Sequence, residues 1–241
     1  MNSTINMIDM YNTLVELGER ADFYNKDTNE IVATQYLSIT PNKSNKAIGT
    51  TEGTYLYIGT MTFQSLAQQK DLRGTLFNRE ADNSERFELL SVSPCPFTEK
   101  IGTIQCMMCN DFIDIISHYD TTGYNQWNEP IVSPIYTGKN IPIYTTMVNK
   151  PAQNVTVGAL DKSITFMTIS AKYPISQKSI IMKRAFIFNE ETKQNEYIKI
   201  PYKIESIDTS MVDELNGELT GVIKCYLSES QDKQEGLNIN A

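Results

Sequence analysis

The chain has 241 residues, of which 40% are hydrophobic and 21% are charged, so it can bury the core of one large domain or two small ones. Its formal net charge of −8 argues against a protein that mainly grips phosphates, because such a protein needs a basic surface. The sequence holds no run of about 18 apolar residues, so we expect no membrane span and no membrane partner. The N-terminus lacks the pattern of a signal peptide, and four scattered cysteines indicate a reduced, cytoplasmic environment rather than a disulfide framework.

The first predicted element, within residues 1–18, is an amphipathic helix over residues 4–17. Ser3 or Thr4 can cap its start, and Gly18 can end it in the left-handed conformation. An isolated helix of this length is marginal in water, so we expect its apolar stripe to be buried against a neighbouring subunit or another protein. The stripe recurs at helical spacing and consists of Ile8, Tyr11, Leu14 and Val15.

The rest of the chain has the pattern of short strands, rich in aromatic and β-branched residues and separated by Asn, Gly, Asp, Ser and Pro clusters. Residues 68–76 are an exception and indicate a short helical or irregular excursion. The regular spacing predicts a mainly β fold, with the helix followed by two small antiparallel β-barrel or sandwich modules. The clearest strands are 55–63, 141–148, 164–169 and 197–207. After the helix, the sequence predicts four parts: a first β module at 19–122, a linker at 123–139, a second β module at 140–230 and a polar C-terminal tail at 231–241.

Two pairs of short segments suggest an internal repeat. Residues 76–92 parallel residues 187–207, since each segment has an apolar residue, Phe-Asn, a polar acidic turn and an alternating strand. Further on, GTIQC at 102–106 parallels GVIKC at 221–225. Two interpretations stay open, a duplicated module and chance matches between short segments.

The strongest chemical motif is the pair Cys106 and Cys109, whose spacing is typical of a zinc knuckle or a redox pair. Cys225 occupies the place of Cys106 in the repeat, yet position 228 is Ser228 rather than a second cysteine. Residues an odd number apart point to opposite faces of a strand, so the two thiols would not converge on one metal. Adding Cys95 and His118 completes four ligands only at an atypical spacing. We therefore predict small, buried structural thiols and no metal site.

The other chemical candidates are weaker. His118 is the sole histidine, so a serine or cysteine triad would have to use it, and Cys109 is the nearest thiol. The acidic pairs Glu190-Glu191 and Asp213-Glu214 lie in polar, turn-like stretches and are expected to be solvated. No phosphate-cradling glycine loop exists. We therefore predict no catalytic residue, no cofactor and no enzyme activity.

Four further residues are candidate contacts with a subunit or partner. Tyr124 and Trp127, in the predicted linker, have two interpretations, since they could anchor a partner or pack the two modules together. In the tail, Leu237 and Ile239 lie two residues apart and so share one face of an extended strand. That strand could pair with a sheet edge of an adjacent subunit, or the tail could be a frayed terminus.

Residues 85–115 and residues 161–230 are two long stretches that resemble the neck proteins of tailed bacteriophages, the connector or head-closure rings below the portal. The first is ERFELLSVSPCPFTEKIGTIQCMMCNDFIDI, at 85–115, where an apolar strand, a polar turn and two further strands follow in order. The second runs over 161–230 and is similar to the terminal module of these proteins, with strands at 184–188, 202–208 and 221–227. The resemblance covers roughly 71–230 and is carried by structural rather than chemical motifs.

The resemblance implies a structural virion protein, assembled in the host cytoplasm, that forms a homo-oligomeric ring of sixfold or twelvefold symmetry. Its partners would be itself, the portal protein and tail proteins, and genomic DNA would pass through a central channel without specific binding. The net negative charge of the chain is consistent with such a channel, because an acidic wall could neutralise few phosphates of the passing DNA. The alternative, from a different class, is a monomeric all-β ligand-binding module of carbohydrate type, which the 13 tyrosines would suit.

Overall fold

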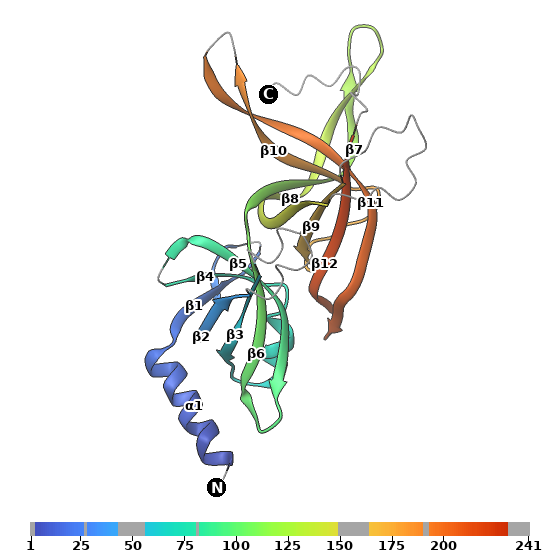
Figure 1. Ribbon diagram of the computed structural model, residues 1–241. Coiled ribbons are helices and arrows are strands. Elements are labelled where there is room, and N and C mark those ends of the chain that lie inside the picture. The colour runs from blue at the N-terminus through green and yellow to red at the C-terminus, as the bar shows by residue number, and fades with distance from the viewer. Residues whose placement is uncertain are drawn as a thin grey trace, which may run out of the picture.

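The computed structural model describes residues 3–26, 28–42, 56–80, 82–148, 164–189 and 193–230. Helix α1 (Ser3–Leu17) precedes two closed barrels of six strands each, barrel 1 and barrel 2 (Figure 1). Barrel 1 consists of β1 (Glu19–Tyr24), β2 (Ile31–Pro41), β3 (Leu56–Thr62), β4 (Leu76–Arg79), β5 (Asp82–Cys95) and β6 (Thr98–Met108), with helix α3 (Leu66–Asp71) between β3 and β4. Barrel 2 consists of β7 (Asp111–Tyr124), β8 (Pro130–Val148), β9 (Ile164–Ser170), β10 (Ile180–Asn189), β11 (Gln194–Leu215) and β12 (Glu218–Glu229).

Both barrels have the same topology. The order around barrel 1 is β1-β2-β3-β6-β5-β4, and the order around barrel 2 is β7-β8-β9-β12-β11-β10. All neighbouring strands pair antiparallel. The mainly β fold with two small antiparallel modules is therefore confirmed. Each module is a barrel and not an open sandwich.

The short sequence matches fall on equivalent strands of the two barrels. The described residues of 76–92 lie on the hairpin β4–β5, and those of 187–207 lie on the equivalent hairpin β10–β11. GTIQC lies on β6 and GVIKC on β12, which occupy the same place in the strand order. This agreement between sequence matches and topology supports the duplication over chance.

The predicted boundary between the modules is wrong. Residues 123–139 form the end of the hairpin β7–β8, and β7 already belongs to barrel 2. The barrels meet instead at Cys109-Asn110, where the amide of Cys109 bonds to the carbonyl of Arg86 in barrel 1 and the amide of Asn110 bonds to the carbonyl of Ile143 in barrel 2. The error has a physical cause, because a solvated hairpin tip needs the same polar, turn-forming residues as a linker.

The N-terminal helix is confirmed, but its predicted ends are not. Ser3 and Thr4 both lie inside the helix rather than at a cap. Gly18 donates its amide to the carbonyl oxygen of Leu14 at 2.9 Å and is not left-handed. Glycine is needed at this position for another reason, because a Cβ at residue 18 would overlap the carbonyl group of Leu14. The excursion predicted at 68–76 is α3, which begins earlier, where the hydroxyl of Ser65 caps the amide of Gln68.

Each barrel is filled by its own apolar core, and a third apolar cluster joins the two. Leu90 and Met107 of barrel 1 pack there against Tyr144, Phe166 and Val222 of barrel 2. The barrels therefore share a buried seam. Within the described residues, no helix has the length and apolar character needed to cross a membrane.

Candidate interaction surfaces

The thiols of Cys106 and Cys225 lie at equivalent positions of the two barrels, as the repeat predicts. Cys106 is fully buried in the core of barrel 1, and Cys225 is fully buried in the core of barrel 2. Burial raises the pKa of Cys225 to about 12 and raises the pKa of Cys106 strongly as well. A thiolate is the form that binds metal or attacks an electrophile, so burial disfavours the reactive form of both side chains. The prediction that these two side chains are small and buried is confirmed.

Cys109 lies at the end of β6 and is half-buried. Its thiol pKa is raised well above the ordinary value, first by burial and then by the nearby carboxyl group of Glu88, while Arg86 opposes this. Within the described ranges, no group of three or more His, Cys, Asp or Glu side chains is arranged to hold a metal ion.

Replacing Cys109 by serine should leave fold and assembly essentially intact. Serine is close to cysteine in size, and the thiol makes no bond on which the junction depends, because the contact to Arg86 comes from the backbone amide. We expect a shift in the midpoint of urea unfolding that corresponds to less than about 1 kcal/mol. Stoichiometric zinc in elemental analysis of the native protein, lost in this variant, would contradict a structural role.

His118 lies beside a serine and an aspartate that the sequence pattern did not single out. Ser117 Oγ is 2.7 Å from His118 Nδ1, and His118 Nε2 is 3.2 Å from Asp120 Oδ1. The order resembles a hydrolytic triad, but the His118 and Asp120 side chains are 60% and 59% exposed on β7. None of the three lines the cavity described below. Because His118 and Asp120 are open to solvent on the strand, we interpret the arrangement as a polar contact.

The apolar stripe of α1 is only partly buried. Leu14 is 6% exposed and packs on barrel 1, and the ring of Tyr11 lies 5.7 Å from Lys100 Nζ. Ile8 is 59% exposed and Val15 is 36% exposed. Half of the predicted stripe therefore holds the helix to its own barrel, and the other half stays open to solvent.

The hairpin β7–β8 extends beyond barrel 2 as an arm, the β7–β8 arm, formed by residues 117–136. Tyr124 and Trp127 lie at its tip, 65% and 72% exposed. They do not pack the two modules together, so that interpretation is wrong. The turn below them is well defined, because Asn125 Oδ1 accepts from the amides of Trp127 and Glu129, both at 2.9 Å, and Asn125 Nδ2 donates to the Glu129 carboxylate at 2.7 Å. An exposed indole is thus presented on an ordered turn.

The hairpin β10–β11 forms a second arm, the β10–β11 arm, whose described residues are 184–189 and 193–199 and which the sequence analysis missed. Phe186, Phe188 and Tyr197 are 63%, 62% and 67% exposed. Phe186 and Tyr197 are partners across the hairpin, with ring centroids 3.9 Å apart. The alternation of Phe186 and Phe188 was available in the sequence, but it is equally typical of a strand face that packs into a core.

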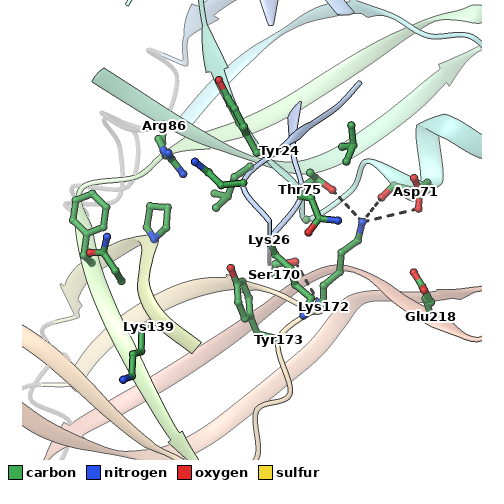
Figure 2. Close-up of a pocket in the computed structure, with 18 residues that line it drawn as sticks. Tyr24, Lys26, Asp71, Thr75, Arg86, Lys139, Ser170, Lys172, Tyr173 and Glu218 are labelled. Atoms are coloured by element: carbon green, nitrogen blue, oxygen red, sulfur yellow. Dashed lines mark hydrogen bonds and ion pairs between the residues drawn. The ribbon is translucent and has the colours of Figure 1, made fainter. Parts of the chain in front are cut away.

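A cavity of about 640 Å³ lies between the barrels (Figure 2). From barrel 1 its wall includes Tyr24, Lys26 and Arg86, and from barrel 2 it includes Lys172 and Tyr173. Lys172 is held by barrel 1, since its ammonium donates to the carbonyl of Asp71 at 3.1 Å and to the hydroxyl of Thr75 at 3.3 Å. Lys26 Nζ lies 5.3 Å from the ring centre of Tyr173, and the Arg86 guanidinium lies 5.5 Å from that of Tyr24.

The predicted contacts Leu237 and Ile239, like the acidic pair Glu190-Glu191, lie outside the described residues. Asp213 is 57% exposed, as expected of a solvated carboxylate, and it also forms an ion pair with Arg73 across the seam. Searches with known protein families, with curated proteins and with solved structures gave no match to this chain.

Proposed function

We propose that this chain is a structural virion protein of the neck of tailed bacteriophages, where copies form a ring between the portal and the tail. The observation that supports it best is the exposure of apolar side chains on three ordered elements, α1 and the two arms, at the ends of a molecule whose cores are otherwise well filled. Exposed aromatic residues on ordered elements are the usual anchors of protein interfaces. The resemblance of residues 71–230 to neck proteins is the reason for proposing a ring as the assembly that these contacts form.

The closed barrels fit this proposal. A closed barrel leaves no unpaired strand edge within its ladder, so uncontrolled edge-to-edge association is suppressed. Association must then use side chains of protruding elements, which can specify one geometry. The net charge of −8 would keep DNA from adhering to a channel formed by such a ring.

The proposal is tested by the assembly state of the purified full-length protein. We expect negative-stain electron micrographs to show rings, and mass photometry to show particles of six or twelve copies. The same sample serves as its own control on dilution, because rings held by apolar contacts should dissociate to single subunits. A protein that stays monomeric, alone and with the portal protein added, would contradict the proposal.

Deleting residues 1–18 should impair assembly more than folding. Only Leu14 of the apolar stripe is fully buried in barrel 1, so most of the barrel core is independent of the helix. The proposed partner, by contrast, would lose its contacts with Ile8 and Val15. We expect a small loss of thermal stability and a drop of at least tenfold in apparent association, on the scale of one or two interface anchors. Normal incorporation of the truncated protein into virions would argue against docking by α1.

A second candidate function is a monomeric ligand-binding module of carbohydrate type, favoured by the cavity between the barrels and its two tyrosines. Against it, a cation already lies over the ring of each tyrosine, where a sugar would stack. Titration calorimetry with neutral and acidic oligosaccharides separates the candidates. Binding by a monomer that Tyr173→Ala abolishes would favour the ligand-binding module.

A further inference from the structure

The cavity between the barrels has more cations than carboxylates in its wall, although the chain as a whole has a net charge of −8. Within the described part of the chain, the charged residues that line it are Lys26, Arg86, Lys139, Lys172, Asp71 and Glu218. Figure 2 shows Arg86 and Lys139 on one side of the cavity and the two carboxylates on the opposite side, beyond Lys172. One side of the cavity is therefore cationic.

Lys172 belongs to the side of the carboxylates, where it joins the two barrels. Its ammonium group lies 4.0 Å from the Asp71 carboxylate and also donates to the carbonyl oxygen of Asp71 and to the hydroxyl of Thr75. Asp71 and Glu218 are both exposed, so solvent and salt screen their charges. Among the described residues, neither carboxylate forms an ion pair with Arg86 or Lys139. The cations on the opposite side are therefore not compensated from here.

Arg86 and Lys139 are held by aromatic rings instead of carboxylates. The Arg86 guanidinium lies 5.5 Å from the ring centre of Tyr24, and Lys139 Nζ lies 4.2 Å from that of Tyr136. In the ranges that the structure describes, neither cation has a carboxylate within ion-pair distance. A ring contact positions a cation without neutralising it, and it leaves N–H groups that can donate to a further acceptor. Both side chains are thus prepared to bind an anion.

The size and lining of the cavity indicate how large that anion is. Its volume of about 640 Å³ is in the usual range for a site that encloses an organic molecule, so a single inorganic ion would leave most of it unfilled. Beside the cations, the wall includes the apolar side chains of Leu76, Phe112 and Pro142. An apolar or ring-shaped body with a charged end therefore fits this wall better than a fully polar molecule.

We propose that the cavity is a binding site for a small organic dianion, a phosphate monoester or a dicarboxylate, whose oxygens accept hydrogen bonds from Arg86 and Lys139. Arg86 lies on β5 of barrel 1 and Lys139 on β8 of barrel 2, so the bound anion ties the two barrels together. The guanidinium suits either kind of group, because its N–H donors match both carboxylate and phosphate oxygens. The inference does not depend on the proposed ring.

The test is titration calorimetry of the full-length protein at pH 7.5 and low salt, with phenyl phosphate and with phthalate as separate probes. At least one probe should bind with a Kd of about 1 mM or tighter. Arg86→Gln and Lys139→Gln should each weaken its binding by at least about tenfold, the effect of losing one charge-assisted hydrogen bond. Lys100→Gln is the matched control and should bind like the wild type, since Lys100 also lies over a tyrosine ring but does not line the cavity.

Thermal unfolding gives a second readout, because a ligand that binds only the folded protein stabilises it. At a hundredfold excess over Kd, the probe should raise the Tm of the wild type and of Lys100→Gln by about 5 to 10 °C, and that of the other two variants much less. Should Arg86→Gln fail to fold, Lys139→Gln still tests the site, because Lys139 is exposed.

The pattern of binding decides the outcome. Binding of one probe only would support the site and assign its ligand to that probe's class. Absence of binding by both probes, or binding that both glutamine variants retain in full, would overturn the site. Equal binding of phenyl glucoside, which is neutral, would show that the cavity recognises the ring rather than the charge, and would also overturn it. None of these results bears on whether the chain forms rings.

Discussion

Replacing Gly74 by alanine should lower the free energy of unfolding by about 2 to 5 kcal/mol. Gly74 has a φ of +74°, where an L side chain costs about 1–2 kcal/mol. It also lies directly against Gly221, whose φ is +97°, so that a Cβ at Gly74 would overlap the carbonyl oxygen of Gly221. Relieving that overlap means moving the backbone of β12 away from barrel 1, and overpacking of this kind typically costs a further 1–3 kcal/mol.

Two other glycines make the experiment quantitative. Gly217 has a φ of +83° but open space where a Cβ would be, so Gly217→Ala measures the backbone cost alone, about 1–2 kcal/mol. Gly123 has neither constraint, so Gly123→Ala should be near neutral. Urea unfolding followed by circular dichroism should rank the three variants in that order. Equal effects at Gly74 and Gly217 would show that the barrels do not need this close backbone contact.

Raising the pH from 5 to 8 should destabilise the protein through Glu88, and Glu88→Gln should remove that loss. Glu88 is 2% exposed on β5, and burial raises its pKa from 4.5 to about 8, an effect that the nearby hydroxyl of Thr168 on barrel 2 only partly opposes. The half-buried thiol of Cys109 is a further titratable neighbour. Below pH 4.5 the folded and unfolded states both hold the proton, so this carboxyl group has no net effect there.

Between pH 4.5 and 8 the unfolded chain releases the proton while the folded protein keeps it. The unfolded state therefore binds fewer protons, and the free energy of unfolding falls by up to about 1.4 kcal/mol per pH unit, on the order of 3 to 5 kcal/mol in total. Urea midpoints at pH 5, 6, 7 and 8 measure the slope. Glu88→Gln should flatten it, whereas Glu80→Gln, an exposed glutamate of the preceding turn, should follow the wild type. Parallel slopes in the wild type and in Glu88→Gln would contradict the assignment.

The sequence predicts the strands well because the core of a small barrel has to be filled by β-branched and aromatic residues at alternate positions. Ile164 to Ile169 show this pattern, and they form β9. What alternation cannot report is how far a hairpin continues beyond the barrel. Strands β8 and β11 have 19 and 22 residues, and only part of each lies in the barrel ladder. The arms were therefore interpreted as a linker or as ordinary strands.

For the candidate contacts too, the sequence pattern shows which residues are apolar but not whether they are buried. Leu14 was expected to face a partner but packs on its own barrel, because the helix lies beside β2 and β3 and its last turns are within reach of their side chains. Trp127 is exposed because a polar, hydrogen-bonded turn holds it away from both barrels. Phe186 and Phe188 have the alternation of buried residues, yet they are exposed, since sequence patterns show which residues share a face and not what covers that face.

The two-residue junction at Cys109-Asn110 has a mechanical consequence. Besides its backbone bond to barrel 2, Asn110 exchanges two hydrogen bonds with the backbone of Thr145, at 2.8 and 2.9 Å, so the junction has little freedom to rotate. The Arg73–Asp213 ion pair and the bonds of Lys172 brace the seam at other points. The two barrels are therefore expected to move as one rigid body rather than as two independently moving domains. A load applied to the arms of barrel 2 is transmitted to α1 on barrel 1 without being absorbed by a hinge.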